Sequence, residues 1–204
     1  MANLKETRSR ITSVKSTMQI TSAMKMVSAA KLKRASDAIL GMRPYAQKMQ
    51  EIMQNVSAGL GEVRSEYSAK PHEVKNVLLV AISSNRGLAG AFNANVIKKT
   101  NSLINNDYAG KKVSVVCIGK KVNDFFRRTD NYYKGEDVPN ELNSLLDHLA
   151  FDKVRPVAET IMKAYVNGKF DKIVLVYNQF KNAAVQIITA EDFLPVNEGA
   201  HLPS

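Results

Sequence analysis

The stretch Leu4-Lys-Glu-Thr-Arg-Ser-Arg-Ile-Thr-Ser-Val-Lys-Ser-Thr17 opens a run without glycine or proline that continues to Leu40. Its apolar residues recur at spacings of three, four and seven, which places them along a helical stripe. The stripe has two sets, and the break between them is typical of a stutter in a coiled-coil seam. The first set is Leu4, Ile11, Val14 and Met18, and the second is Ile20, Met24, Val27 and Ala38.

The run predicts a helix of roughly forty residues, which would be about 60 Å long at 1.5 Å per residue. The segment Gly41-Met-Arg-Pro44 is expected to kink or pause it, because proline removes one hydrogen bond of the ladder. Apolar residues at Met49 and Ile52 indicate that the helix resumes, and we place the end of this shaft segment at residue 58. A helix of this length cannot cover its stripe against a small domain, so it needs a partner helix or a sleeve of other subunits.

Positive charge is concentrated in the same region. The chain carries a net charge of +10, and residues 1–43 hold nine lysines and arginines against only Glu6 and Asp37. Such an arm suits nucleic acid, anionic lipid or an acidic protein surface. Residues 1–44 lack the aromatic side chains that would stack on bases, and the stripe lacks the bulky residues of a membrane-surface helix. Its small, flexible side chains favour a shaft inside an acidic protein sleeve.

Residues 59–75 are polar and contain glycines and a proline, so we interpret them as a linker. A different pattern follows this segment. Residues 76–196 alternate short apolar runs with helical stretches, as expected for a Rossmann-like α/β domain of about five mostly parallel strands covered by helices. The last two strands are close in sequence and predict an antiparallel hairpin at one edge. The expected strands are 77–82, 113–118, a weaker 131–134, 172–177 and 184–189, and the expected helices are about 91–105, the stretch through 125–126, 140–148 and 153–166.

A glycine turn, Ser83-Ser-Asn-Arg-Gly-Leu-Ala-Gly-Ala-Phe92, follows the first of these strands. A turn that leads into a helix at this point often binds phosphate. The spacing Gly87-x-x-Gly90 matches neither GxGxxG nor the GxxxxGK[ST] phosphate loop. We therefore favour a structural role for Asn85, Arg86, Gly87 and Gly90 over nucleotide binding.

No pattern predicts catalysis, a cofactor or a metal site. His72, His148 and His201 have no neighbours at ligand spacing, and Cys117, the one cysteine, is expected to be a small buried hydrophobe. Glu191 and Asp192 are interpreted as solvating a turn after a strand. No run approaches the ~18 apolar residues of a membrane-spanning helix, so no direct span is expected.

Several of these segments resemble one family closely. Residues 4–17 and Gln19-Ile-Thr-Ser-Ala-Met-Lys-Met-Val-Ser-Ala-Ala-Lys-Leu-Lys-Arg34 resemble the N-terminal helix of the gamma subunits of F-type rotary ATP synthases. The glycine turn resembles that family's signature, although Asn85, Ala89 and Ala91 stand where the family often has Asp, Cys and Gly. Later landmarks follow in order at Arg43-Pro-Tyr45, Gly119-Lys, Phe125-Phe-Arg-Arg128, Tyr177-Asn-Gln-Phe180 and Phe193-Leu-Pro195.

The resemblance implies a non-catalytic rotor subunit, which transmits rotation of a membrane c-ring to catalytic beta subunits. Its partners would be the alpha, beta and epsilon subunits and the c-ring, and it would not bind nucleic acid. It would be a peripheral protein on the cytoplasmic side of the bacterial inner membrane. In the family a second long helix returns along the first as an antiparallel coiled coil, so 197–204 would begin that region. The residues implied to contact the catalytic subunits are Arg8, Arg10, Met24, Lys25, Lys31, Lys33 and Arg34.

The alternatives are a basic coiled-coil interaction protein and a nucleic-acid-binding protein with an α/β domain. A nucleic-acid-binding protein would show affinity that falls steeply with salt. A coiled-coil interaction protein would bind one partner without any link to ATP hydrolysis.

Overall fold

The computed structural model describes residues 3–59, 65–68, 73–135, 138, 142–147 and 149–196. The chain divides into two compact units, residues 1–59 and 60–204. The predicted linker is described only at residue 59, at 65–68 and at 73–75, and the predicted helical start at 197–204 lies outside the described residues.

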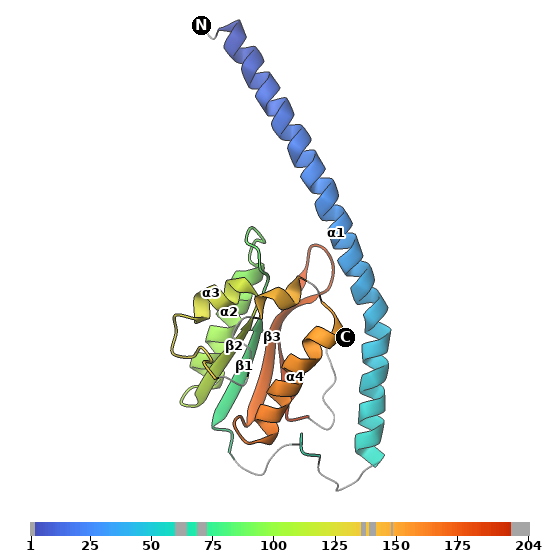
Figure 1. The fold of residues 1–204 in the computed structure, drawn as a ribbon, viewed down its shortest axis with the longest axis vertical. Helices are drawn as coiled ribbons and strands as arrows, with labels where there is room; N and C mark the ends of the chain where they lie inside the picture. The colour runs from blue at the N-terminus through green and yellow to red at the C-terminus, as the bar shows by residue number, and fades with distance from the viewer. Residues whose placement is uncertain are drawn as a thin grey trace. The chain divides into compact units, whose positions relative to one another are not determined.

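The first unit is a single helix, α1 (Leu4–Gly59, 56 residues), which confirms the predicted long N-terminal helix. Of the kink or pause expected at Gly41–Pro44, the pause does not occur, because the helix continues through Pro44. Proline leaves the carbonyl of Leu40, four residues earlier, without its helical donor. Leu40 is exposed, so water can take that donor's place without ending the helix. Figure 1 shows the axis of α1 curving along its length.

The second unit is built on a four-stranded sheet in the order β2-β1-β3-β4. Its strands are β1 (Asn76–Ile82), β2 (Lys112–Ile118), β3 (Lys172–Phe180) and β4 (Gln186–Leu194). β1 pairs in parallel with both β2 and β3, and β4 pairs antiparallel with β3 at the edge. The predicted parallel core and edge hairpin are therefore confirmed.

The sheet has four strands where about five were expected. The segment 131–134 makes only an isolated parallel bridge between Tyr132 and Val115. Its backbone bonds are Val115 N–H to the carbonyl of Asn131 (2.7 Å) and Tyr133 N–H to the carbonyl of Val115 (3.0 Å). The carbonyl of Val113 accepts a hydrogen bond from the Asn131 side-chain amide (3.0 Å). A side chain thus takes a position in the ladder that backbone would occupy in a full strand.

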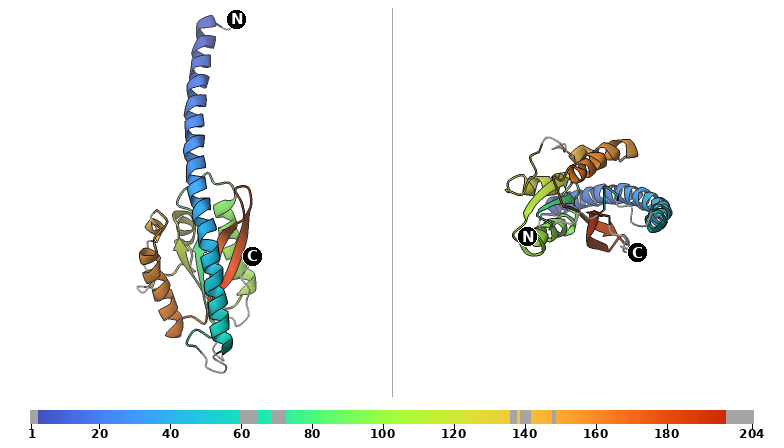
Figure 2. Two further views of the ribbon diagram at one scale, coloured as in Figure 1. Left: turned by 90° about the vertical axis from the view of Figure 1, so that its right-hand side faces the viewer. Right: turned by 90° about the horizontal axis from the view of Figure 1, so that it is seen from below.

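Helices cover both faces of this sheet (Figure 2). The predicted 91–105 helix is α2 (Phe92–Ser102), continued by a π-helical turn, η1 (Leu103–Asp107). α3 (Lys120–Phe126) and α4 (Phe151–Val166) confirm the other two longer predictions. Within the expected helix 140–148, the described part contains a single 3-10 turn, η2 (Asn143–Leu146).

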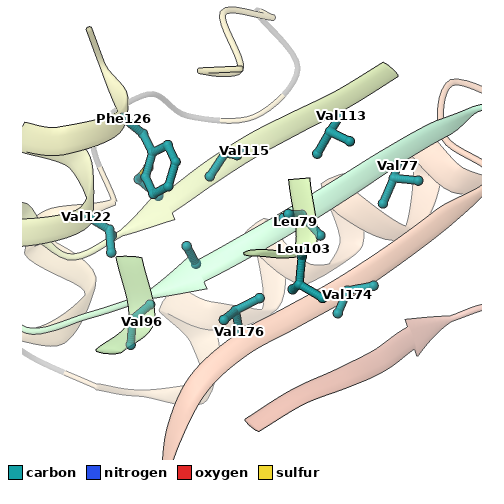
Figure 3. Close-up of a cluster of buried hydrophobic side chains, with 12 residues drawn as sticks. Val77, Leu79, Val96, Leu103, Val113, Val115, Val122, Phe126, Val174 and Val176 are labelled. Atoms are coloured by element: carbon teal, nitrogen blue, oxygen red, sulfur yellow. The ribbon is translucent and has the colours of Figure 1, made fainter. Parts of the chain in front are cut away.

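Alternate strand residues enter two separate hydrophobic cores. In β1, Val77, Leu79 and Ala81 face the core under α2 and α3, while Leu78 and Val80 face the core under α4. Figure 3 shows the first core, with strand valines beneath side chains from α2 and α3. Because both faces are covered, the strands need no polar alternation, which is why they are nearly continuous apolar runs.

Gly119, between β2 and α3, is the tightest point of this framework. Its φ is +101°, and a Cβ built there would lie 2.2 Å from the carbonyl oxygen of Ser83. Only glycine fits, since any side chain would meet both an unfavourable backbone angle and a backbone atom.

We predict that Gly119→Ala lowers the free energy of unfolding by about 3 kcal/mol, because it adds an overlap to left-handed strain. Gly110→Ala is the matched control, since Gly110 also has a positive φ (+78°) but open space around its Cβ position. Urea unfolding of the two variants measures the difference. Equal losses would mean that the contact with Ser83 adds nothing.

Candidate functional site

The surface of α1 is the first candidate site. Every described side chain from residue 3 to residue 49 is exposed, apart from the half-buried Ser36 and Ile39. Large apolar side chains share this exposure, as at Met18 (64%) and Met24 (65%). Uncovered apolar surface on this scale is typical of an interaction site.

The two apolar sets of α1 lie on opposite sides of the helix. Ile11 and Ile20 are nine residues apart, as are Met18 and Val27, and nine residues make about two and a half turns. Since α1 is one uninterrupted helix, the break between the sets does not realign them. A partner along one side could cover only one set, so α1 requires contacts on more than one side.

Thr17 and Thr21 line a groove together with Val14 and Met18 of the first apolar set, whereas Thr12 lies about a third of a turn away from that set. Thr12, Thr17 and Thr21 donate their hydroxyls to the backbone carbonyls four residues earlier, at 2.9–3.0 Å. These internal bonds satisfy the hydroxyl donors, so the N-terminal half of α1 is less polar than its composition suggests. A shallow groove there is lined by Thr7, Arg10, Ile11, Val14, Lys15 and Met18.

The seven implied contact residues are all exposed on α1, but they do not gather in one patch. Lys25 and Arg34 point to opposite sides of the helix, and so, nearly, do Lys31 and Lys33 at about 100° per residue. None of the ion pairs among the described residues involves the seven. Arg8 to Arg34 spans about 40 Å of helix at 1.5 Å per residue. The arrangement is a collar of positive charge around the helix.

The second candidate is the glycine turn, at the carboxyl ends of the parallel strands. The first three amides of α3 all donate to this turn. Lys120 N–H donates to Asn85 Oδ1 (3.0 Å), Lys121 N–H to the carbonyl of Ser84 (3.2 Å), and Val122 N–H to Ser83 Oγ (3.0 Å). Oxygen atoms of the turn thus serve as the acceptors for the start of α3, which supports a structural role for the turn.

Further bonds hold the turn in place. The Asn85 side-chain amide donates to the carbonyl of Asn143 (2.7 Å) and approaches Asp147 Oδ1 (3.3 Å), which ties the turn to η2. Asn93 Oδ1 accepts from both the backbone and hydroxyl of Ser84, and its amide donates to the carbonyl of Arg86 (3.2 Å). The turn is therefore a hub that joins β1, α2, α3 and η2.

The two predicted glycines differ in role. Gly90 has a φ of +56° and needs glycine's conformational freedom, whereas a Cβ at Gly87 would make only an ordinary 3.6 Å contact with the Lys121 side chain. Between them, Leu88 has a φ of +57° and is fully exposed.

The sequence alone assigned no role to the side chains of Ser83, Asn93 and Asn143, and it marked Gly119 only as a landmark of the family resemblance. A polar residue directly after each buried strand and a glycine before a helix were the available signals. Their pairing across 39 residues between Ser83 and Val122 could not be read from spacing.

The cysteine thiol and the paired acids singled out in the sequence lie within the strands of the sheet. Cys117 is buried in the first core, as predicted, and burial raises the pKa of its thiol to about 12. Glu191 and Asp192 lie within β4 rather than in a turn, which corrects that interpretation. Glu191 accepts a hydrogen bond from the Tyr177 hydroxyl (2.6 Å), and burial together with this bond raises the pKa of Tyr177.

Among the described residues, no three His, Cys, Asp or Glu side chains form a group that could hold a metal ion. The three histidines lie outside the described residues. No helix in the described part of the chain has the length and apolar character needed to cross a membrane.

A long basic helix whose apolar side chains are exposed is typical of a protein that works through contact with other chains. A protein-family model described as ATP synthase matches residues 3–202. The chain belongs to the family of ATP synthase gamma chains. It is 57% identical over 197 residues to the ATP synthase gamma chain of Flavobacterium johnsoniae, covering 96% of this chain and 66% of that relative.

The gamma chain of Christiangramia forsetii is 52% identical over 198 residues, covering 97% of this chain and 67% of that relative. The chain thus spans about two thirds of the length of these curated relatives. A Tetrahymena thermophila mitochondrial ATP synthase structure, of the central stalk and c-ring, matches with a TM-score of 0.60 at 22% identity, covering 90% of this chain and 80% of that one. A Euglena gracilis mitochondrial ATP synthase rotor matches with a TM-score of 0.52 at 21% identity, covering 94% and 62%. These structures share the fold.

We predict that Asn85→Ala lowers the free energy of unfolding by about 1–3 kcal/mol, because it removes the acceptor of the Lys120 amide and the donor to η2. Asn106→Ala is the control, since that exposed side chain makes a single 3.3 Å bond to Ser102 Oγ. Chemical denaturation of both variants tests the turn as a hub, and a loss no greater than the control's would contradict it.

The exposed sets on α1 also predict that the purified chain self-associates. Replacing Ile11, Val14 and Met18 by Gln should weaken association at least several-fold, because it removes apolar surface worth about 25 cal/mol per Å². The same change at Ser9, Ser13 and Ser16, on the other side of the helix, is the control. Sedimentation velocity over a range of concentrations provides the readout. A fully helical monomer at every concentration would refute the prediction.

Proposed function

We propose that this chain is the central-stalk rotor subunit of a proton-translocating ATP synthase, and that it transmits rotation of the membrane c-ring to the catalytic beta subunits. It makes no covalent step itself. The observation that carries the proposal is α1, a 56-residue helix with apolar surface on two sides and positive charge all round. The gamma-chain relatives supply the assembly in which such a helix would be enclosed.

The distribution of charge favours a sleeve over a flat partner. A helix that lay on one surface would need its basic residues on one side, whereas Lys25 and Arg34 point in opposite directions. In a ring of alpha and beta subunits, each subunit would face a different side of α1. The basic collar would then meet acidic loops of the beta subunits in turn as the shaft rotated.

Coupling requires unequal contacts. Rotation changes the affinity of a catalytic site only if the shaft contacts the states of that site with different free energies. α1 meets this requirement because its sides differ: the Ile11 side, the Ile20 side and the sides that carry Lys31 and Lys33 present different chemistry. We assign the contact role to Arg8, Arg10, Met24, Lys25, Lys31, Lys33 and Arg34.

The second unit would join the shaft to the membrane ring and the epsilon subunit. A framework of two packed cores, with a hub at one end of the sheet, suits a part that must carry torque without deforming. The protein would then lie peripherally on the cytoplasmic side of the bacterial inner membrane, and the named organisms of the gamma-chain relatives are bacteria.

The test is charge reversal at Lys31 and Lys33 together, in the assembled ATP synthase. We expect proton-driven ATP synthesis per assembled complex to fall several-fold while the amount of assembled complex stays within about twofold. The reason is that exposed charges at the rim of an interface affect how the partners approach and align more than they affect how tightly they bind. Reversal at Lys98 and Lys153, two exposed lysines of the second unit, is the matched control. Unchanged synthesis would remove these residues from the coupling contact.

A further inference from the structure

The amino-terminal edge of the sheet, where the parallel strands begin, collects lysines from distant parts of the chain. Lys75 precedes β1, Lys111 and Lys112 begin β2, and Lys169 precedes β3. α2 and α4 run opposite to the strands, so their last turns bring Lys99 and Lys163 to the same edge. We call these six residues the lysine edge. In Figure 1 this is the end of the sheet where β1 begins and α4 ends.

Backbone pairing fixes this arrangement. Lys112 N–H donates to the carbonyl of Lys75 (2.9 Å), which sets the starts of β1 and β2 side by side. Asp171 N–H donates to the carbonyl of Asn76 (2.8 Å), which does the same for β1 and β3. Five of the six lysines are exposed, and Lys99 is half-buried. Lys75, Lys111 and Lys112 make no ion pair with any described residue.

The acids of this edge do not cancel its charge. The Asp171 carboxylate already takes part in backbone hydrogen bonds, because its Oδ2 accepts from the backbone amides of Lys75 (2.9 Å) and Asn76 (2.8 Å). Exposed Glu73 and Asp107, together with exposed Asp130, which the parallel bridge at Tyr132 places level with Val113, remain against the six lysines. Lys172 is paired with Asp192 (2.9 Å) and is not counted. Residues 44–204 together carry only about three net positive charges by sequence count. The lysine edge can account for all of them.

The chemistry of the edge favours a fluid anionic surface over a protein partner. Protein interfaces are enriched in Arg, Tyr and Trp and depleted in Lys, whereas all six basic residues here are lysines. None of the large apolar side chains exposed in the described part of the chain belongs to these strand starts. The lysine side chain is flexible and carries a compact charge, so it can contact phosphates in many orientations. The planar arginine side chain instead favours paired, directional hydrogen bonds.

We infer that the lysine edge binds the anionic phospholipid headgroups of a bilayer surface through phosphate contacts, without inserting into it. Each lysine near such a surface contributes about 1 kcal/mol, which is roughly fivefold in binding. This inference goes beyond the rotor role and does not depend on it, because it concerns a face of the second unit and can be measured without the assembled enzyme.

The experiment is co-sedimentation of the whole chain with vesicles of phosphatidylcholine that contain about a third phosphatidylglycerol. One variant replaces Lys75, Lys111, Lys112 and Lys169 by Gln. The matched control replaces Arg86, Lys120, Lys153 and Lys181 by Gln, four exposed basic residues of the same unit on the side where the parallel strands end. Both variants have the same net charge and the same α1, so any difference reports position. Circular dichroism checks that both remain folded.

We expect the edge variant to bind at least tenfold more weakly than the control variant, and the parent chain to ignore vesicles of phosphatidylcholine alone. Equal binding by the two variants would overturn the inference, since binding would then follow net charge or α1. The inference would also be overturned if the edge variant bound duplex DNA tenfold more weakly than the control variant did, because the edge would then be a general site for polyanions. A failure here leaves the coupling test on Lys31 and Lys33 unaffected.

Discussion

A helix as long as α1 exposes far more apolar surface than it can cover within its own unit. Isolated helices owe most of their stability to packing against something else. In α1 nearly every described side chain is exposed, and the two apolar sets face opposite directions. A single flat partner would leave one set in water. Enclosure by several chains covers both, and the rest of the interpretation depends on that constraint.

In the second unit the situation is reversed, because almost all of strand β1 is buried. β1 is paired on both edges and covered on both faces, so its residues contribute to two cores at once. At its carboxyl end the chain must still turn, and the first amides of α3 must still find acceptors. The turn supplies Ser83, the carbonyl of Ser84 and Asn85 for this purpose. A position where α/β proteins often hold a ligand is thus used to hold the fold.

The two positively charged regions differ in chemistry as well as in place. The collar on α1 mixes arginine and lysine with exposed methionine and isoleucine, as expected for contact with protein. The lysine edge has lysines only, on a rim formed by strand starts and helix ends. A net charge of +10 therefore has at least two separate sources, for which we propose different kinds of partner.

What the amino-acid sequence determined by itself was local. The absence of helix breakers before Leu40, the spacing of its apolar residues and the continuous apolar runs at β1, β2 and β3 were enough to predict α1 and a parallel sheet, because periodicity and burial act over a few residues. The resemblance to the gamma-chain family also rested on short stretches such as 4–34. Tertiary structure decided the rest, since it depends on which distant segments meet. It showed that 131–134 makes one bridge instead of a strand, because the Asn131 side chain occupies the ladder. It placed the amides of α3 against the glycine turn, and it brought Lys75, Lys112 and Lys169 to one edge, because parallel strands align their starts whatever the length of chain between them.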